Sequence, residues 1–295
     1  MGDIEVPASF LAMPRWWTEG AEWLASLPAA LAERCDAWGL VVDGEPLHGS
    51  NALVVPVLRG TERLVLRLSP PDAAFAAERD ALAFWAGRGT VMLVGDDDSG
   101  ALLLERLDTT GTLADEPLEV AMDQLGRAMR RLAVAAPASA PSTADIVLSR
   151  LPELEPQWEQ LGRPFDRALL DAAIAAGRPL QHTATPDTAV NGDLHADQVL
   201  RGSREPWLVV DPLLLRGDIE YDLARALWTR VDEMGDPPEI LDCFSRMVRA
   251  AGLDDHRARA WALYRTVDYW LWALNAGLTI DPGRCRRVAG ALTRG

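Results

Sequence analysis

Short apolar runs separated by turn residues dominate the first third of the chain. Residues 20–38 carry apolar side chains at helical spacing and are followed by Gly39, which predicts a helix. The next apolar runs are short and predict antiparallel strands, at 40–42, 52–58, 63–69, 90–95 and 101–108. Residues 69–89 are rich in alanine and end in the sequence GRG, which predicts one inserted helix. We expect this part to form an α+β unit.

After Asp108 the pattern becomes mainly helical. Residues 118–136 form an amphipathic pattern, a loop is expected at 136–143, and helical patterns cover 144–178 and the region from 218 to the end. Two short apolar pieces, 199–200 and 207–210, predict a hairpin between these helices. The chain is therefore expected to have a small sheet-rich lobe at 1–107 and a larger helical lobe at 108–295.

Composition narrows the class of protein. A length of 295 residues suits two lobes, and the net charge of −15 argues against nucleic acid as a partner. The acidity favours solubility and would also attract a cationic small molecule. The three cysteines, Cys35, Cys243 and Cys285, lie far apart, which argues against a disulfide framework or a zinc site. Because no signal peptide or membrane span is visible, we expect a cytoplasmic protein with no membrane partner, and nothing indicates its oligomeric state.

Candidate chemistry lies in the segment NGDLHADQ, residues 191–198. Asp193 sits in a predicted loop, Gln198 follows five residues later, and Asp211 ends the predicted strand WLVVDP. Two oxygen ligands held across a hairpin suit a hard cation such as Mg²⁺. A third carboxylate nearby can accept a hydroxyl proton, an arrangement that serves phosphoryl transfer.

The segments NGDLHADQVL and EPWLVVDPLLLRGDIEYDLARALW resemble the catalytic region of the aminoglycoside phosphotransferases. They are most similar to the branch of streptomycin 6-kinases and hydroxyurea kinases. The stretches LVVPVLRGTERLVLRLSPP and ALLLERLD resemble the small lobe of that branch. The resemblance implies a protein-kinase-like two-lobed fold that binds ATP and magnesium. It also implies a kinase that phosphorylates a hydroxyl of a small molecule, for example an aminoglycoside-type antibiotic such as streptomycin.

The resemblance also assigns roles to individual residues. Asp193 takes the position of the catalytic aspartate, and Asp211 and Gln198 take those of the metal ligands. Arg67 takes the position that holds the α- and β-phosphates, and Glu78 is its expected carboxylate partner. The segment joining the lobes, which would bind adenine, contains Glu105 and Leu107, and the turn over the phosphates contains Gly49, Ser50 and Asn51.

This chain departs from the family pattern in three places. Asn191 begins the catalytic motif, Arg67 replaces a lysine, and Gln198 replaces an asparagine. An arginine is not interchangeable with a lysine, and magnesium demands tight geometry. A catalytically weak or inactive pseudokinase that binds a nucleotide or a small ligand is therefore the alternative hypothesis. A metal-dependent hydrolase that uses the same acids is a third, with only four histidines to support it.

Further polar residues have two interpretations each. Asp218, Glu220 and Asp222 could form an acidic patch for a basic substrate. Alternatively, Asp218 caps the helix that follows, and the resemblance implies that Asp222 anchors the catalytic loop. His195 could be a general base. The resemblance implies instead that His195 is structural and bonds to backbone near the metal-binding aspartate.

One late helix offers a candidate acceptor site. It carries polar and aromatic residues at i, i+4 and i+7, on one face: Asp268, Trp272 and Asn275. We expect this face to line the pocket for the small-molecule hydroxyl acceptor.

Overall fold

The computed structural model describes residues 6–13, 20–182 and 184–294. Contacts between Cα atoms divide the chain into two compact units, Met1–Leu107 and Asp108–Gly295. Among the described residues, no helix combines the length and the apolar character needed to cross a bilayer.

The first unit is built on a six-stranded antiparallel sheet. In chain order its elements are α1 (Ala8–Leu11), α2 (Ala21–Trp38), β1 (Val41–Val42), β2 (Leu47–His48), β3 (Leu53–Arg59), β4 (Glu62–Leu68), α3 (Ala73–Trp85), β5 (Leu93–Asp96) and β6 (Ala101–Glu105). The strand order is β1-β3-β4-β6-β5, and β2 also pairs with β3. The strands predicted from the short apolar runs are thus present, together with the additional strand β2.

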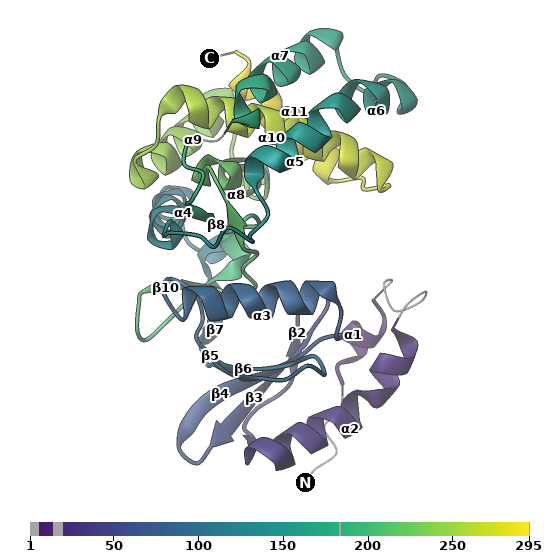
Figure 1. The fold of residues 1–295 in the computed structure, drawn as a ribbon, viewed down its shortest axis with the longest axis vertical. Helices are drawn as coiled ribbons and strands as arrows, with labels where there is room; N and C mark the ends of the chain where they lie inside the picture. Colours follow the sequence, from purple (N-terminus) through teal and green to yellow (C-terminus); the bar gives the residue numbers. More distant parts are fainter. Residues whose placement is uncertain (1–5, 14–19, 183, 295) are drawn as a thin grey trace. The chain divides into compact units, whose positions relative to one another are not determined.

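Helices cover both faces of this sheet (Figure 1). On one face, Leu27 and Leu31 of α2 pack in one apolar cluster with inward residues of β3 and β4, such as Val55 and Leu66. On the opposite face lies α3, which begins where the Asp72 side chain accepts hydrogen bonds from the N–H groups of Ala74 and Phe75. Because both faces are covered, five consecutive residues of β4, 64–68, are buried.

The second unit is mainly helical. Its helices are α4 (Leu118–Leu132), α5 (Thr143–Arg150), α6 (Leu154–Gln160), α7 (Arg167–Gly177), α8 (Leu223–Trp228), α9 (Pro237–Ala251), α10 (Asp255–Asn275) and α11 (Asp281–Leu292). Its strands are β7 (Asp108–Thr112), β8 (Ala189–Val190), β9 (Val199–Arg201), β10 (Trp207–Val209) and β11 (Leu215–Arg216). They form two small antiparallel sheets, β10-β9-β7 and β11-β8.

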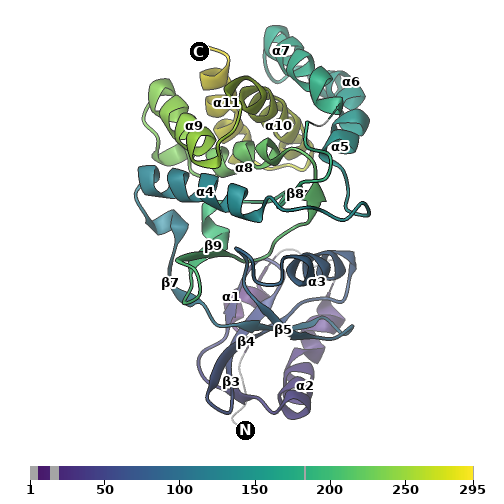
Figure 2. The ribbon, with the colours of Figure 1, turned by 60° about the vertical axis from the view of Figure 1, so that its left-hand side comes forward.

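Close helix packing forms the core of the second unit. Helices α4 and α9 lie side by side (Figure 2). Gly126 of α4 permits this approach, because a Cβ atom there would lie 2.6 Å from the carbonyl oxygen of Met247. Helix α10 runs through the middle of the unit and buries Trp261 and Tyr264 against its neighbours. These helices support the two small sheets, which carry the candidate site.

Candidate active site

A two-stranded ladder brings two segments of the site together. β8 pairs with β11, with Val190 opposite Leu215. Immediately after β8, the Asn191 side chain accepts a hydrogen bond of 2.9 Å from the N–H of Leu213, and Asn191 is only 1% exposed. The segment that begins at Asp211 is therefore tied to the loop that begins at Asn191.

Gly192 and Asp222 shape that loop. Gly192 has a φ of +83°, and a Cβ atom there would lie 2.8 Å from Leu215 Cδ1, so a side chain would be strained and crowded. The N–H groups of Gly192 and Leu194 face the buried carboxylate of Asp222, whose Oδ1 atom has no hydrogen-bond partner among the described residues. Asp222 thus lies against the loop that carries Asp193, where the resemblance places it.

Burial raises the pKa of Asp222 to about 7, and the negative charge of Asp193 adds to this effect. The positive charge of Arg265 opposes the rise most, and the facing N–H groups of Gly192 and Leu194 oppose it as well.

Asp193 is held from two sides and still reaches solvent. Its side chain is 37% exposed, and its Oδ1 atom lies 2.8 Å from Nε of Arg225 in α8. These two atoms form an ion pair, although the Nε–H bond is not aligned for a hydrogen bond. Its Oδ2 atom accepts a hydrogen bond of 3.3 Å from Nε2 of Gln198. The carboxylate is therefore oriented and accessible, as an acceptor of a hydroxyl proton must be.

The amide of Gln198 has its oxygen turned away from Asp193. An ionised carboxylate only accepts hydrogen bonds, so the amide nitrogen must face it. The Oε1 atom is buried and has no hydrogen-bond partner in the part of the chain that the structure describes. A buried oxygen without a donor costs free energy unless a ligand satisfies it. Its chemistry therefore fits a magnesium ligand.

Asp211 is placed beside Gln198 by the backbone. The N–H of Val210 donates a hydrogen bond of 2.8 Å to the carbonyl of Gln198. Asp211 follows directly, is exposed, and has a φ of +50°, a left-handed conformation that is uncommon for a residue other than glycine. Such strain often accompanies functional positions.

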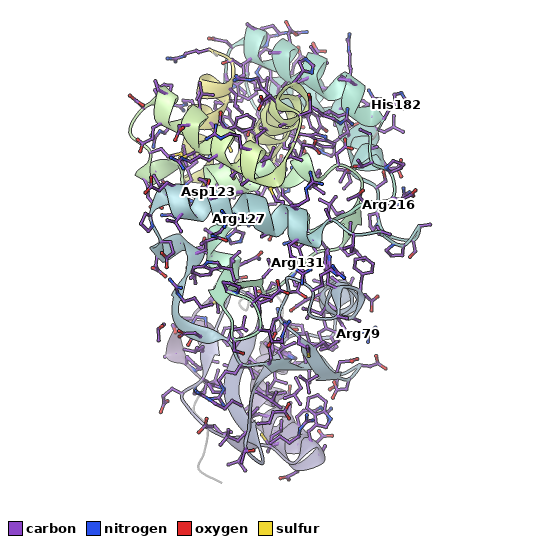
Figure 3. The ribbon with its side chains drawn as sticks, turned by 90° about the vertical axis from the view of Figure 1, so that its left-hand side faces the viewer. Arg79, Asp123, Arg127, Arg131, His182 and Arg216 are labelled. Atoms are coloured by element: carbon purple, nitrogen blue, oxygen red, sulfur yellow. The ribbon has the colours of Figure 1, made fainter. Side chains whose placement is uncertain are left out.

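The hairpin between Gln198 and Asp211 is fixed at its far end. Arg131 of α4, labelled in Figure 3, donates two hydrogen bonds to the carboxylate of Glu205, at 3.0 and 2.8 Å. On β9, Arg201 pairs with Glu116 and stacks over the ring of Trp207, 4.5 Å from its centroid. Bidentate pairs of this kind fix geometry well. Gln198 and Asp211, the expected metal ligands, thus lie at the ends of a braced hairpin.

In the first unit, Arg67 points toward α3 and not into solvent. It is 4% exposed, and its Nη2 atom lies 2.8 Å from Oε2 of Glu78. Its guanidinium also donates to Ser69 Oγ at 3.2 Å and, more weakly, to Asn51 Oδ1 at 3.5 Å. The structure therefore brings Arg67, Glu78 and Asn51 together.

The other residues expected near the nucleotide occupy two segments of the same unit. Ser50 is exposed in the turn between β2 and β3, which closes with a bond of 3.1 Å from Gly49 N–H to Ala52 O. At the end of β6, the N–H of Glu105 donates to Met92 O at 3.0 Å, and its carboxylate accepts from Met92 N–H at 2.8 Å. Leu107, the last residue of the unit, is buried.

Two expectations for the acidic triplet are wrong. Asp218, Glu220 and Asp222 are all buried, so they do not form a surface patch for a basic substrate. Asp218 does not cap the following helix with its side chain. Its carboxylate turns inward and accepts from Arg257 Nε at 2.9 Å and from Trp261 Nε1 at 2.9 Å. A buried carboxylate requires such partners, and this need outweighs the local preference for capping.

The expectation for His195 is also wrong in detail. Its Nδ1 atom lies 3.2 Å from the carboxylate of Asp197, two residues along the chain, and not on a backbone group near Asp211. The interaction lowers the pKa of Asp197.

The three residues expected at the acceptor site have different surroundings on α10. Asp268 accepts hydrogen bonds of 3.0 and 2.8 Å from Arg150 of α5. Trp272 is half exposed and stacks on Tyr269 at a ring-centroid distance of 5.3 Å. Tyr269 in turn stacks on the buried Trp228 at 4.3 Å. Asn275 is exposed at the end of α10.

Arg225 and Tyr269 are the functional candidates that sequence reasoning missed. Arg225 is a cation in the apolar helix DLARALW, three residues after Asp222, and this is the signal that could have identified it. Tyr269 had no comparable signal, because an aromatic residue in a helix usually belongs to the core.

Comparison with known proteins identifies the family. The family model described as aminoglycoside/hydroxyurea antibiotic resistance kinase matches residues 37–277. The chain belongs to this family of kinases. It is 37% identical over 286 residues to streptomycin 6-kinase of Streptomyces griseus, covering 94% of this chain and 92% of that enzyme. It is 36% identical over 301 residues to hydroxyurea phosphotransferase of Kitasatospora aureofaciens, covering 98% and 86%. The expectation of a small-molecule kinase is confirmed.

Solved structures confirm the fold class. The structure of aminoglycoside phosphotransferase APH(4)-Ia matches with a TM-score of 0.60 and 19% identity, covering 91% of this chain and 99% of that chain. Choline kinase LicA from Streptococcus pneumoniae matches with a TM-score of 0.60 and 12% identity, with the same coverages. The chain therefore has the protein-kinase-like fold that the resemblance implied.

Proposed function

We propose that this kinase transfers the γ-phosphoryl group of ATP to a hydroxyl of a small molecule, with an aminoglycoside-type antibiotic such as streptomycin as the first candidate. One observation carries the proposal. Asp193 is oriented and accessible, and it is hydrogen-bonded to Gln198, whose buried amide oxygen has no partner among the described residues. A carboxylate and a free amide oxygen are the groups expected beside a phosphate that is bound to magnesium.

Each residue has a role in this proposal. Asp193 orients the acceptor hydroxyl and accepts its proton, while the ion pair with Arg225 holds that carboxylate in place. Gln198 and Asp211 hold Mg²⁺, which supplies positive charge at the transferred phosphoryl group when bound. Arg67, braced by Glu78, holds the α- and β-phosphates.

The first unit would bind the remaining parts of the nucleotide, including the adenine ring. Ser50 and Asn51 cover the phosphates. Because the N–H of Glu105 already bonds to Met92, we assign adenine recognition mainly to the backbone near Leu107.

The acceptor is expected on α10, at the residues Asp268, Trp272 and Asn275. Trp272 offers an exposed indole at the end of an aromatic stack, which suits contact with a ring of the acceptor. Asp268 already forms an ion pair with Arg150. It would accept a hydrogen bond from the acceptor molecule while it keeps that ion pair.

The test is a coupled ADP-release assay with streptomycin and with hydroxyurea as separate acceptors, followed by mass measurement of the product. We expect turnover with at least one acceptor and a loss of at least about 100-fold in kcat for Asp193→Asn. Asp187→Asn is the matched control, because Asp187 is exposed and lies six residues upstream. Stabilisation by ATP and magnesium without turnover of any hydroxyl acceptor would refute the proposal and indicate a nucleotide-binding pseudokinase.

A further inference from the structure

A small basic region stands out at the end of this acidic chain. Residues 281–295 contain four arginines and one aspartate, whereas the whole chain has a net charge of −15. Three of these arginines line a cavity of about 240 Å³ between α11 and the beginning of α9. The α11 side is formed by Arg286, Arg287, Gly290 and Arg294, and the α9 side includes Asp236 and Pro237.

The arginines of this cavity keep their charge available. Arg287 is fixed by carbonyl groups, donating to Val231 O at 2.7 Å and to Met234 O. Carbonyls orient a guanidinium without neutralising it. The nearest carboxylate, Asp232, lies 3.9 Å from Arg287 and is bound more closely by Arg284, at 2.6 Å.

The other two arginines, Arg286 and Arg294, are exposed. Within the described residues, neither of their side chains forms an ion pair.

The acidic side chains at the start of α9 accept hydrogen bonds from nearby backbone N–H groups. Asp236 accepts a hydrogen bond of 3.0 Å from Glu239 N–H, and the Glu239 carboxylate accepts one of 2.5 Å from Gly235 N–H. Pro237 and Pro238 have no N–H, so the first turn of α9 adds no free donor at these positions. Any anion in the cavity would therefore be bound by the guanidinium groups.

The shape of the cavity also suits a ligand. At Gly290 an added Cβ would meet no atom within 4 Å, so the face of α11 between Arg286 and Arg294 is open. Arg286 and Gly290 lie one turn apart on the same face of α11, and Arg294 follows in the turn just after the helix. A planar guanidinium offers two parallel N–H groups, which match two oxygens of a phosphate.

We propose that this cavity is a binding site for a tetrahedral oxyanion of the phosphate type, separate from the catalytic loop. Arg287 supplies a fixed donor group, and the side chains of Arg286 and Arg294 close on the anion from either side of Gly290. The site does not depend on the proposed phosphotransfer activity.

The test uses inorganic phosphate as the probe. Melting temperature is measured against sodium phosphate, with sodium chloride at matched ionic strength, for the wild type and for the double variant Arg286→Gln/Arg294→Gln. Both side chains are exposed, so the variant should fold. Arg249→Gln is the control, since Arg249 is an exposed arginine near the other end of α9. We expect phosphate at ten times its Kd to raise the wild-type melting temperature by about 3 °C beyond chloride. The control should keep this increment and the double variant should lose it.

Equal effects of phosphate and chloride on the wild type would overturn the proposal. So would an increment that survives in the double variant, because phosphate would then be binding elsewhere, for example at the nucleotide site. Free phosphate and a nucleotide phosphate are two sources of the same group, so a second arm replaces phosphate with AMP. If only phosphate gives a rise in melting temperature that the double variant loses, the ligand is free phosphate. If only AMP gives such a rise, the ligand is a nucleotide phosphate.

Discussion

Replacing Arg67 with lysine tests whether this kinase is built around its arginine. The guanidinium uses two nitrogens to reach three acceptors, the side chains of Glu78, Ser69 and Asn51. A lysine carries one compact ammonium group on a flexible stem, so it cannot hold the same three positions with a planar fork. The substitution restores the residue typical of the family and yet should damage this protein.

The magnitude follows from the contacts that are lost. If the lysine ammonium keeps the ion pair with the mostly buried Glu78, the hydrogen bonds to Ser69 and Asn51 are lost. Each is worth about 0.5–1.5 kcal/mol net, so the free energy of unfolding should fall by about 2 kcal/mol. If the ammonium fails to reach Glu78, the cost rises toward about 3–5 kcal/mol, because a buried carboxylate loses its partner. A misplaced cation should also raise the KM for ATP by about tenfold, equivalent to about 1.4 kcal/mol.

Two measurements on one preparation check this prediction: urea unfolding, and the KM for ATP at saturating acceptor. Arg63→Lys is the control, since Arg63 is exposed on the same strand. It should change neither quantity by more than about 0.5 kcal/mol. If Arg67→Lys equals or exceeds the wild type in stability and in kcat/KM, then Arg67 is not adapted to its partners and the reasoning fails.

Three further predictions concern the second unit. Gln198→Leu removes the buried amide oxygen, and kcat should fall about tenfold or more with a raised magnesium requirement, measured by titrating the rate with Mg²⁺; an unchanged requirement would exclude the metal role. Gly192→Ala puts a Cβ 2.8 Å from Leu215 Cδ1 at a φ of +83°, so urea unfolding should show a loss of about 1–3 kcal/mol, and wild-type stability would contradict the strain argument. The pKa of Asp222 is raised from 3.8 to about 7, so its contribution to stability is complete below about pH 4 and is lost as the pH rises through 7, by at most about 4 kcal/mol. Asp222→Asn should flatten the free energy of unfolding between pH 4 and 8, and an equal slope in both proteins would show that another group titrates.

The sheet of the first unit was largely predictable because its signals are local. The runs at 52–58 and 63–69 differ from β3 and β4 by one residue at each end, since alternation and turn residues mark such strands directly. β2 and β7 could not be found in this way. β7 has the sequence DTTGT, without an apolar residue, and it exists because it pairs with β9, about 90 residues later. Pairing over that distance leaves no local pattern to detect.

The same distinction applies to the site. Asp193, Gln198 and Asp211 share one segment with a motif, so their spacing made them candidates. The ion pair of Asp193 with Arg225 and the bond from Leu213 to Asn191 depend on how β8, β11 and α8 meet in space. For Asp218, the prediction from the local sequence was wrong. Its position before a helix favoured a capping role, whereas its carboxylate lies in the interior and accepts hydrogen bonds from Arg257 and Trp261.

Two of the three departures from the family pattern, Arg67 and Gln198, have a common explanation in the structure. Gln198 is fixed at its backbone, where its N–H bonds to His195 O at 3.1 Å and its carbonyl accepts from Val210. From that fixed position its longer side chain reaches Asp193, which orients the amide and turns the oxygen away. Arg67 likewise uses its extra length and its fork to reach partners on α3 and in the turn at Asn51. Arg67 and Gln198 both have longer side chains than the residues typical of the family. In each case the end of the side chain contacts a partner in the same unit. In a protein that had lost its activity, nothing would keep these side chains matched to their partners. The observed contacts therefore favour an active site that is adapted to Arg67 and Gln198.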